Sequence, residues 1–207
     1  MDRSRCILAV EDRLSEAVGH KLLVYFDMEP TTTIGNRGSG YLKKRARDLN
    51  RTAKGFPVFL LTDQDSPKHC PIEIMKGWLR APCNEGFIFR IAVMEIESWI
   101  MADRQAFASF IGIDTNDISD NPDSIENPKE FMLDLVRKHG KRDLKNALIP
   151  SPGSTARVGP EYNLVMSRFV ARQWDVRRAG SESPSLQRAI SALRSFKYQT
   201  GRQVSDA

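Results

Sequence analysis

The sequence has few of the residues that crosslink secreted proteins or bind zinc. Its 207 residues include three cysteines, Cys6, Cys70 and Cys83, and their spacing shows no disulfide pattern. We therefore expect a reduced, cytoplasmic protein, because disulfides persist mainly in oxidising compartments. His69, Cys70 and Cys83 lack a fourth ligand and a paired spacing, so the sequence disfavours a structural zinc site.

Long apolar runs are also absent from the sequence. None approaches the roughly 20 residues that a membrane-spanning helix needs, so we expect no membrane association. The first residues, Met-Asp-Arg-Ser-Arg and a short apolar run, lack the apolar centre of a signal peptide. The chain has three histidines, His20, His69 and His139, and none has a partner at a spacing that would favour a Ser-His-Asp hydrolase.

The composition that remains is typical of a soluble globular protein. Hydrophobic residues make up 41% and charged residues 28%, in a chain long enough for one large domain or a domain with an extension. The net charge of +5 allows contact with a polyanion. Basic residues gather at 43–47, 137–142 and 168–178, and each group is equally explained as a solvated helix face.

A strand that ends in two carboxylates is the most informative stretch of the sequence. The apolar run from Val58 to Leu61 is too short for an ordinary helix and follows Gly55 and Pro57, which is typical of a strand buried on both faces. Asp63 and Asp65 follow it, one residue apart. Ligands of open α/β sheets bind at the carboxyl ends of the strands. Acids are also common in the turns that end strands, so this pair alone leaves both interpretations open.

Two more candidate strands end in acids. The run Cys6 to Val10 stops at Glu11, where a helical pattern begins, and the run Phe87 to Val93 is followed by Glu95 and Glu97. In a parallel sheet with helical crossovers these ends lie side by side. Carboxylates gathered there repel one another unless a cation lies among them, and hard oxygen ligands favour Mg²⁺ or Mn²⁺. The three coincidences predict a metal site.

The rest of the chain reads as mostly helical. Asn127, Pro128 and Glu130 form a typical helix start, and Gly140 can end that helix. The other predicted elements are a short strand at 31–33, loops at 35–40, 112–127 and 150–160, helices at 42–53, 72–79, 161–176 and 184–196, and a loose end from 201.

Several motifs resemble a known family. They are Ala9-Val10-Glu11, Leu61-Thr62-Asp63-Gln64-Asp65, the block from Ala92 to Asp103 with Glu-Ile-Glu-Ser-Trp, Asn127-Pro128-Lys129, Gly159-Pro160-Glu161-Tyr162-Asn163 and Ser183-Pro184-Ser185-Leu186. The acids after successive strands are similar to the Toprim domain of topoisomerases, primases and OLD-family nucleases. Over nearly its whole length the chain resembles a bacterial family of stand-alone Toprim-like proteins, often encoded beside an ABC-type ATPase in defence loci. One departure is Asp12, where the pattern usually has Gly.

The resemblance implies an α/β fold with a Toprim-like, mostly parallel sheet in residues 1–110. A helical C-terminal extension, 111–207, would pack on this core. It also implies a nuclease for DNA that depends on Mg²⁺ or Mn²⁺. Glu11, Asp63 and Asp65 would hold the first metal ion, and Glu95 and Glu97 a second.

Lys129 lies in the first turn of a predicted helix, where a cation is mildly unfavourable. It resembles in chain order a functional lysine of OLD-type nucleases, so we expect it to serve the acid cluster; a solvent-exposed lysine is the alternative. Two other functions remain open for the chain, a non-catalytic sensor or adaptor for an ATPase partner and a small-molecule phosphotransfer enzyme.

Overall fold

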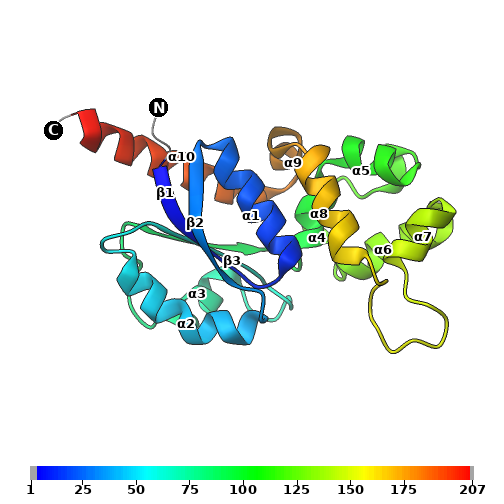
Figure 1. Cartoon of the computed structure of the whole chain (residues 1–207), viewed down its shortest axis with the longest axis horizontal. Helices are drawn as coiled ribbons and strands as arrows, with labels where there is room; N and C mark the ends of the chain where they lie inside the picture. Colours follow the sequence, from blue (N-terminus) through cyan, green and yellow to red (C-terminus); the bar gives the residue numbers. More distant parts are fainter. Residues whose placement is uncertain (1–3, 206–207) are drawn as a thin grey trace.

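The centre of the molecule is a four-stranded parallel sheet (Figure 1). The computed structural model describes residues 4–205, with side chains described for 4–197. The strands are β1 (Ser4–Val10), β2 (Met28–Gly35), β3 (Val58–Asp63) and β4 (Phe87–Ala92), in the spatial order β2-β1-β3-β4. This confirms the predicted α/β class with a parallel sheet flanked by helices. All three strands that were predicted to end in acids belong to the sheet.

Alternate residues of β1, β3 and β4 face two separate apolar layers, as the twofold period of a strand requires. Phe59 and Leu61 of β3 face one layer with α1 (Arg13–Tyr25), α4 (Ile96–Ala102) and α10 (Pro184–Ser205). Val58 and Leu60 face the other layer with α2 (Ser39–Thr52) and α3 (Pro71–Leu79). A sheet covered on both faces explains why β3 is buried along its whole length.

The second half of the chain forms helices that gather beyond one end of the sheet, at the right of Figure 1. They are α5 (Arg104–Ile111), α6 (Pro128–His139), α7 (Arg142–Leu148), α8 (Tyr162–Arg172) and α9 (Val176–Glu182). Helix α8 packs along α1, α9 packs on α4, and α10 returns to cover β4. The buried cluster on this face runs from Cys6 to Phe196, so it continues across the predicted boundary at residue 110.

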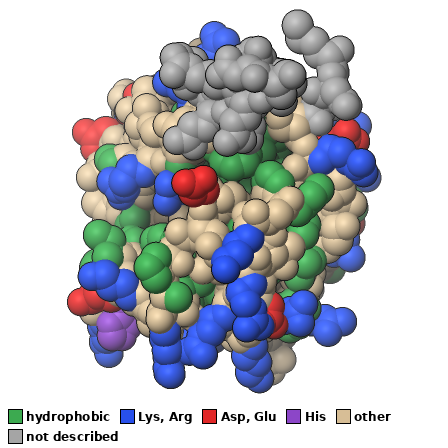
Figure 2. All heavy atoms as spheres, turned by 90° about the vertical axis from the view of Figure 1, so that its left-hand side faces the viewer, with side chains coloured by type: hydrophobic (Ala, Val, Ile, Leu, Met, Phe, Trp, Pro, Cys, Tyr) green, Lys and Arg blue, Asp and Glu red, His purple; other side chains and the backbone are tan. Residues whose placement is uncertain are grey.

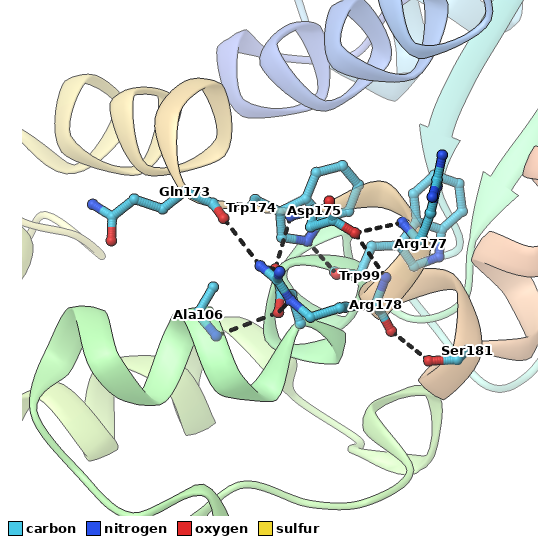
Figure 3. Close-up of polar contacts among 9 residues, drawn as sticks. Trp99, Ala106, Gln173, Trp174, Asp175, Arg177, Arg178 and Ser181 are labelled. Carbon is cyan, nitrogen blue, oxygen red and sulfur yellow. Dashed lines mark hydrogen bonds and ion pairs between the residues drawn. The ribbon is translucent and has the colours of Figure 1, made fainter.

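A polar cluster joins α9 to the start of α5. Asp103 is fully buried, and its two oxygens accept hydrogen bonds from Arg178 Nε at 2.8 Å and Arg178 Nη2 at 2.9 Å. The backbone N–H groups of Ala106 and Asp175 also donate to Asp103, at 3.3 and 2.7 Å. Figure 3 shows Arg178 among these partners, with Trp174 Nε1 donating nearby to the backbone oxygen of Trp99. The cluster ties distant parts of the chain together with charge-assisted bonds.

Several boundaries differ from the expectation. Helices α7 and α9 were not predicted, because each has only seven residues and too few turns to show a period. The loop 112–127 contains two short 3-10 turns, Thr115–Asp117 and Pro122–Ser124. The last helix, which was expected to end near residue 196, continues to Ser205, and residues 206–207 lie outside the described part. Within residues 4–205, no helix is both long enough and apolar enough to cross a membrane.

Candidate functional site

The site begins where the strand order reverses direction. From β1 the chain goes first to β2 on one side and then to β3 on the other, so the ends of β1 and β3 border the crevice where open α/β sheets bind ligands. Glu11 directly follows β1, and Asp63 is the last residue of β3. Glu11 Oε2 accepts hydrogen bonds from Thr62 Oγ1 at 2.8 Å and from the Asp63 N–H at 3.4 Å. These bonds hold the first two acids together.

Two residues with left-handed backbone angles join the ends of β3 and β4. Asp65 has φ of 60° and Met94 has φ of 61°, a region that residues other than glycine rarely adopt. The Asp65 N–H donates to the Met94 backbone oxygen at 2.8 Å, and Gln64 Oε1 accepts from the Met94 N–H at 3.3 Å. Strained backbone of this kind concentrates at functional sites. Asp65 itself is exposed, at the rim of the site.

Glu97, in the first turn of α4, is buried completely beneath this edge of the sheet. Its Oε1 accepts a hydrogen bond of 2.7 Å from the hydroxyl of Tyr162, the first residue of α8. The same oxygen lies 3.3 Å from Lys129 Nζ. Helices of the second half of the chain therefore supply a hydroxyl and an ammonium group to an acid of the first half.

Lys129 contacts two of the predicted site acids. Besides its ion pair with Glu97, its Nζ lies 3.8 Å from Glu95 Oε1, and its backbone N–H donates to Glu95 Oε2 at 2.8 Å. Glu95 thus caps α6, whereas Asn127 at the expected cap position makes no side-chain capping bond. The alternative, a Lys129 side chain that points into solvent, is therefore wrong, because its ammonium contacts the two carboxylates.

Burial dominates the electrostatics of the site. It raises the pKa of Asp63 well above the ordinary range, and the charges of Glu97 and Glu11 raise it further. Burial also raises the pKa of Glu97, while Lys129 and the hydrogen bond from Tyr162 lower it. Burial raises the pKa of Glu11, and the hydrogen bond from Thr62 partly opposes this rise. For Lys129, burial lowers the pKa but the neighbouring carboxylates raise it more, so the ammonium stays charged.

Within residues 4–197, two buried oxygens of the site have no hydrogen-bond partner, Asp63 Oδ1 and Glu97 Oε2. An unpaired buried carboxylate oxygen is costly, and a hard cation is the ligand that would satisfy it. Among the described residues, no group of three or more histidine, cysteine or acidic side chains is arranged to hold a metal ion. Mg²⁺ usually keeps several waters and takes only one or two protein carboxylates together with substrate phosphates. The site fits such an ion and not a closed carboxylate cage.

The six residues predicted for the site fall into two groups. The first group lies inside the site and consists of the acids Glu11, Asp63 and Glu97 with the ammonium of Lys129. The second lies nearer the surface: Asp65 is exposed at the rim, and Glu95 accepts a hydrogen bond from the Lys129 N–H. Two contributors, Thr62 and Tyr162, were not predicted. Tyr162 contacts Glu97 across 65 positions of sequence, a distance at which spacing gives no signal.

Asp12 has a role that the family pattern does not give it. Its φ of −144° is extended backbone, so the position does not require glycine. The Asp12 side chain accepts a hydrogen bond from the Ser15 N–H at 2.8 Å and caps α1. The departure from the pattern therefore stabilises the helix that follows Glu11.

Comparison with known proteins finds no match for this chain among protein-family models, curated proteins or solved structures.

Proposed function

We propose that this chain is a divalent-metal-dependent nuclease of Toprim-like architecture that hydrolyses phosphodiester bonds in DNA. The observation that carries the proposal is the pair of unpartnered buried oxygens, Asp63 Oδ1 and Glu97 Oε2, at the carboxyl edge of a parallel sheet with Lys129 beside them. A fold-only role would leave these two buried oxygens without a partner, which costs stability.

Asp63 and Glu97 would hold Mg²⁺ or Mn²⁺, with Glu11 beside them. A bound ion of this kind supplies a nucleophilic water at neutral pH and neutralises charge on the phosphoryl oxygens. Thr62 fixes Glu11 by donating to Oε2, which leaves Oε1 for water or substrate. Asp65, exposed at the rim, is placed to contact the ligands of the ion rather than the buried interior.

Lys129 supplies the second positive charge of the proposed site. Its ammonium is held by Glu97 and Glu95 and is partly exposed, with 30% of the side-chain surface accessible. In this position it can stabilise negative charge that develops on a phosphate in the transition state. It also offsets part of the negative charge of Glu97 and Glu95, which leaves Glu11, Asp63 and Asp65 for a divalent ion.

Cleavage of supercoiled and linear DNA in Mg²⁺ or Mn²⁺ tests the proposal, with Asp63→Asn as the matched inactive variant. We expect metal-dependent nicking by the wild type and none by the variant. Metal binding is measured separately by thermal unfolding. An ion at about 100 times its dissociation constant should stabilise the wild type by about 2.7 kcal/mol. Equal responses of wild type and Asp63→Asn would place metal binding elsewhere and overturn the proposal.

A non-catalytic adaptor is the second candidate, favoured by the absence of a preformed three-ligand group among the described residues. In that case the acids bind a metal ion or a partner without hydrolysis. The resemblance to proteins encoded beside an ABC-type ATPase motivates the same assay with that ATPase added. Metal-dependent stabilisation without cleavage, both alone and with the ATPase, would favour the adaptor over the nuclease.

A further inference from the structure

A second charged site lies on the edge strand of the sheet, apart from the carboxylate cluster. Arg90 is the one charged residue of β4, and its position in the strand alternation directs it to the face covered by α10. There it shares a surface hollow of about 550 Å³ with Arg188 of α10. The hollow has an apolar floor that includes Phe87 and Ile88.

The two arginines are not neutralised by the protein. Within the described part of the chain, neither Arg90 nor Arg188 forms an ion pair, although Glu85 lines the same hollow. Arg90 Nη1 donates to the backbone oxygen of Phe89 at 2.8 Å, but Arg90 Nε is buried without a partner. Burial lowers the pKa of Arg90, the neighbouring thiol of Cys83 opposes this, and the nearby charge of Arg188 lowers the pKa further. A half-buried cation beside a like charge is unfavourable unless an anion joins them.

We propose that this hollow is a binding site for a phosphate group, held between Arg90 and Arg188. Guanidinium groups present forked N–H donors that match the oxygens of a phosphate, and two such groups offer more donors than one carboxylate accepts. Two further polar residues, Gln187 and Ser191, also line the hollow. The proposal does not depend on the nuclease function, because none of these residues belongs to the carboxylate site.

Thermal unfolding in EDTA tests the site, with inorganic phosphate titrated against sodium chloride at equal ionic strength. We expect phosphate to raise the melting temperature of the wild type and of Arg194→Met, an exposed residue of the same helix outside the hollow. Arg90→Met should lose the response, and without phosphate it should melt at or above the wild-type temperature because an unpaired buried cation is removed. Arg188→Met should weaken the response at least threefold in apparent affinity.

The following results would overturn the proposal. If phosphate acts no better than chloride on the wild type, or if Arg90→Met responds fully, there is no phosphate site in the hollow. If acetate stabilises the protein as strongly as phosphate, the assignment to phosphate is wrong. If Arg90→Met does not fold, the response of Arg188→Met decides, and an unchanged response overturns the proposal. A nucleoside monophosphate and a 5′-phosphorylated dinucleotide then distinguish a free nucleotide from a nucleic-acid end as the source of the phosphate.

Discussion

Asp63 has two properties that each cost stability. It is an acid with only 7% of its surface exposed, and one of its carboxylate oxygens accepts no hydrogen bond from a described residue. Its raised pKa means that the folded protein without metal holds a proton there more tightly than the unfolded chain does. Stability from this group is therefore complete below the unfolded pKa, near 4, and is lost as the pH rises through the folded pKa.

Asp63→Asn should make the metal-free protein less sensitive to pH. In EDTA, we expect the free energy of unfolding of the wild type to fall between pH 5 and pH 8 by more than that of the variant, because Asn carries no charge at either pH. Each unit by which the Asp63 pKa is raised is equivalent to about 1.4 kcal/mol. Urea unfolding at the two pH values measures the difference. Parallel changes in both proteins would show that Asp63 is ionised without penalty in the fold.

Lys129→Met should separate metal binding from catalysis. The change keeps much of the side-chain length but removes the charge next to Glu97 and Glu95. We expect metal-dependent cleavage to fall at least about tenfold, or ~1.4 kcal/mol in the barrier. Metal affinity should be equal or higher, because a neighbouring cation that repels the ion is gone. Lys138→Met, an exposed lysine of the same helix, is the control. Wild-type cleavage by Lys129→Met would remove Lys129 from the mechanism.

The sequence placed the candidate acids near one another because each lies at or soon after the end of a strand, and the strands of a parallel sheet end at one edge. That they form a metal site stays a prediction. It also indicated Lys129, because a cation in the first turn of a helix has no local reason to be there. It did not identify Thr62 or Tyr162. Hydroxyl groups have no fixed spacing from the acids they contact, and the contact depends on how distant helices pack.

Among the described helices, α2 carries the most basic residues, five lysines and arginines within Ser39–Thr52. Its buried stripe of Leu42, Ala46 and Leu49 packs on the sheet, as its sequence predicted, and its exposed side is rich in lysine and arginine. Figure 2 shows basic side chains gathered along the lower part of the molecule, the region where α2 and α3 lie in Figure 1. The helix starts beside the candidate site, because the Gly38 N–H at its N-cap donates to the Glu11 backbone oxygen at 3.0 Å.

Reversing three charges of α2 tests whether DNA lies along it. Lys43, Lys44 and Arg47 are exposed and form no ion pair with any residue that the structure describes. Arg51 is paired with Asp48 and is left unchanged. We expect the Glu triple variant to bind DNA more weakly and to lose about one unit of the log–log salt slope for each phosphate contact removed.

The control for this experiment reverses the same number of charges elsewhere, at Lys138, Lys141 and Arg142, which are also exposed. Its net charge matches that of the α2 variant. An equal change of the salt slope in both variants would mean that only net charge matters, and α2 would then be a solvated face without a specific role.

At the scale of the whole molecule, the two halves of the chain share one apolar core and are also joined by the contact between the buried Asp103 and the half-exposed Arg178. Sequence patterns predicted that helices would pack on the core, but not this contact. Asp103 and Arg178 are 75 residues apart, and α9, which carries Arg178, is too short to predict from its period.

Arg178→Met should destabilise the protein by about 2 kcal/mol. This is less than the usual cost of breaking a buried ion pair, because Arg178 is half exposed and two backbone N–H groups still donate to Asp103. Arg177→Met is the matched control, since Arg177 is exposed and the partner of its guanidinium among the described residues is the exposed Tyr25. Urea unfolding compares the two variants. A loss no larger than that of the control would show that Asp103 does not need the guanidinium.

The hydrogen bond between Tyr162 and Glu97 also means that the site can be completed only late in translation. All the candidate metal-binding acids are translated before residue 98, but the hydroxyl that holds Glu97 follows 65 residues later. At about 5–20 residues per second, this is a delay of roughly 3–13 s on the ribosome. During that interval the nascent chain carries every acid of the site without the tyrosine and, at first, without Lys129. The proposed nuclease is therefore completed only after most of its chain has been synthesised.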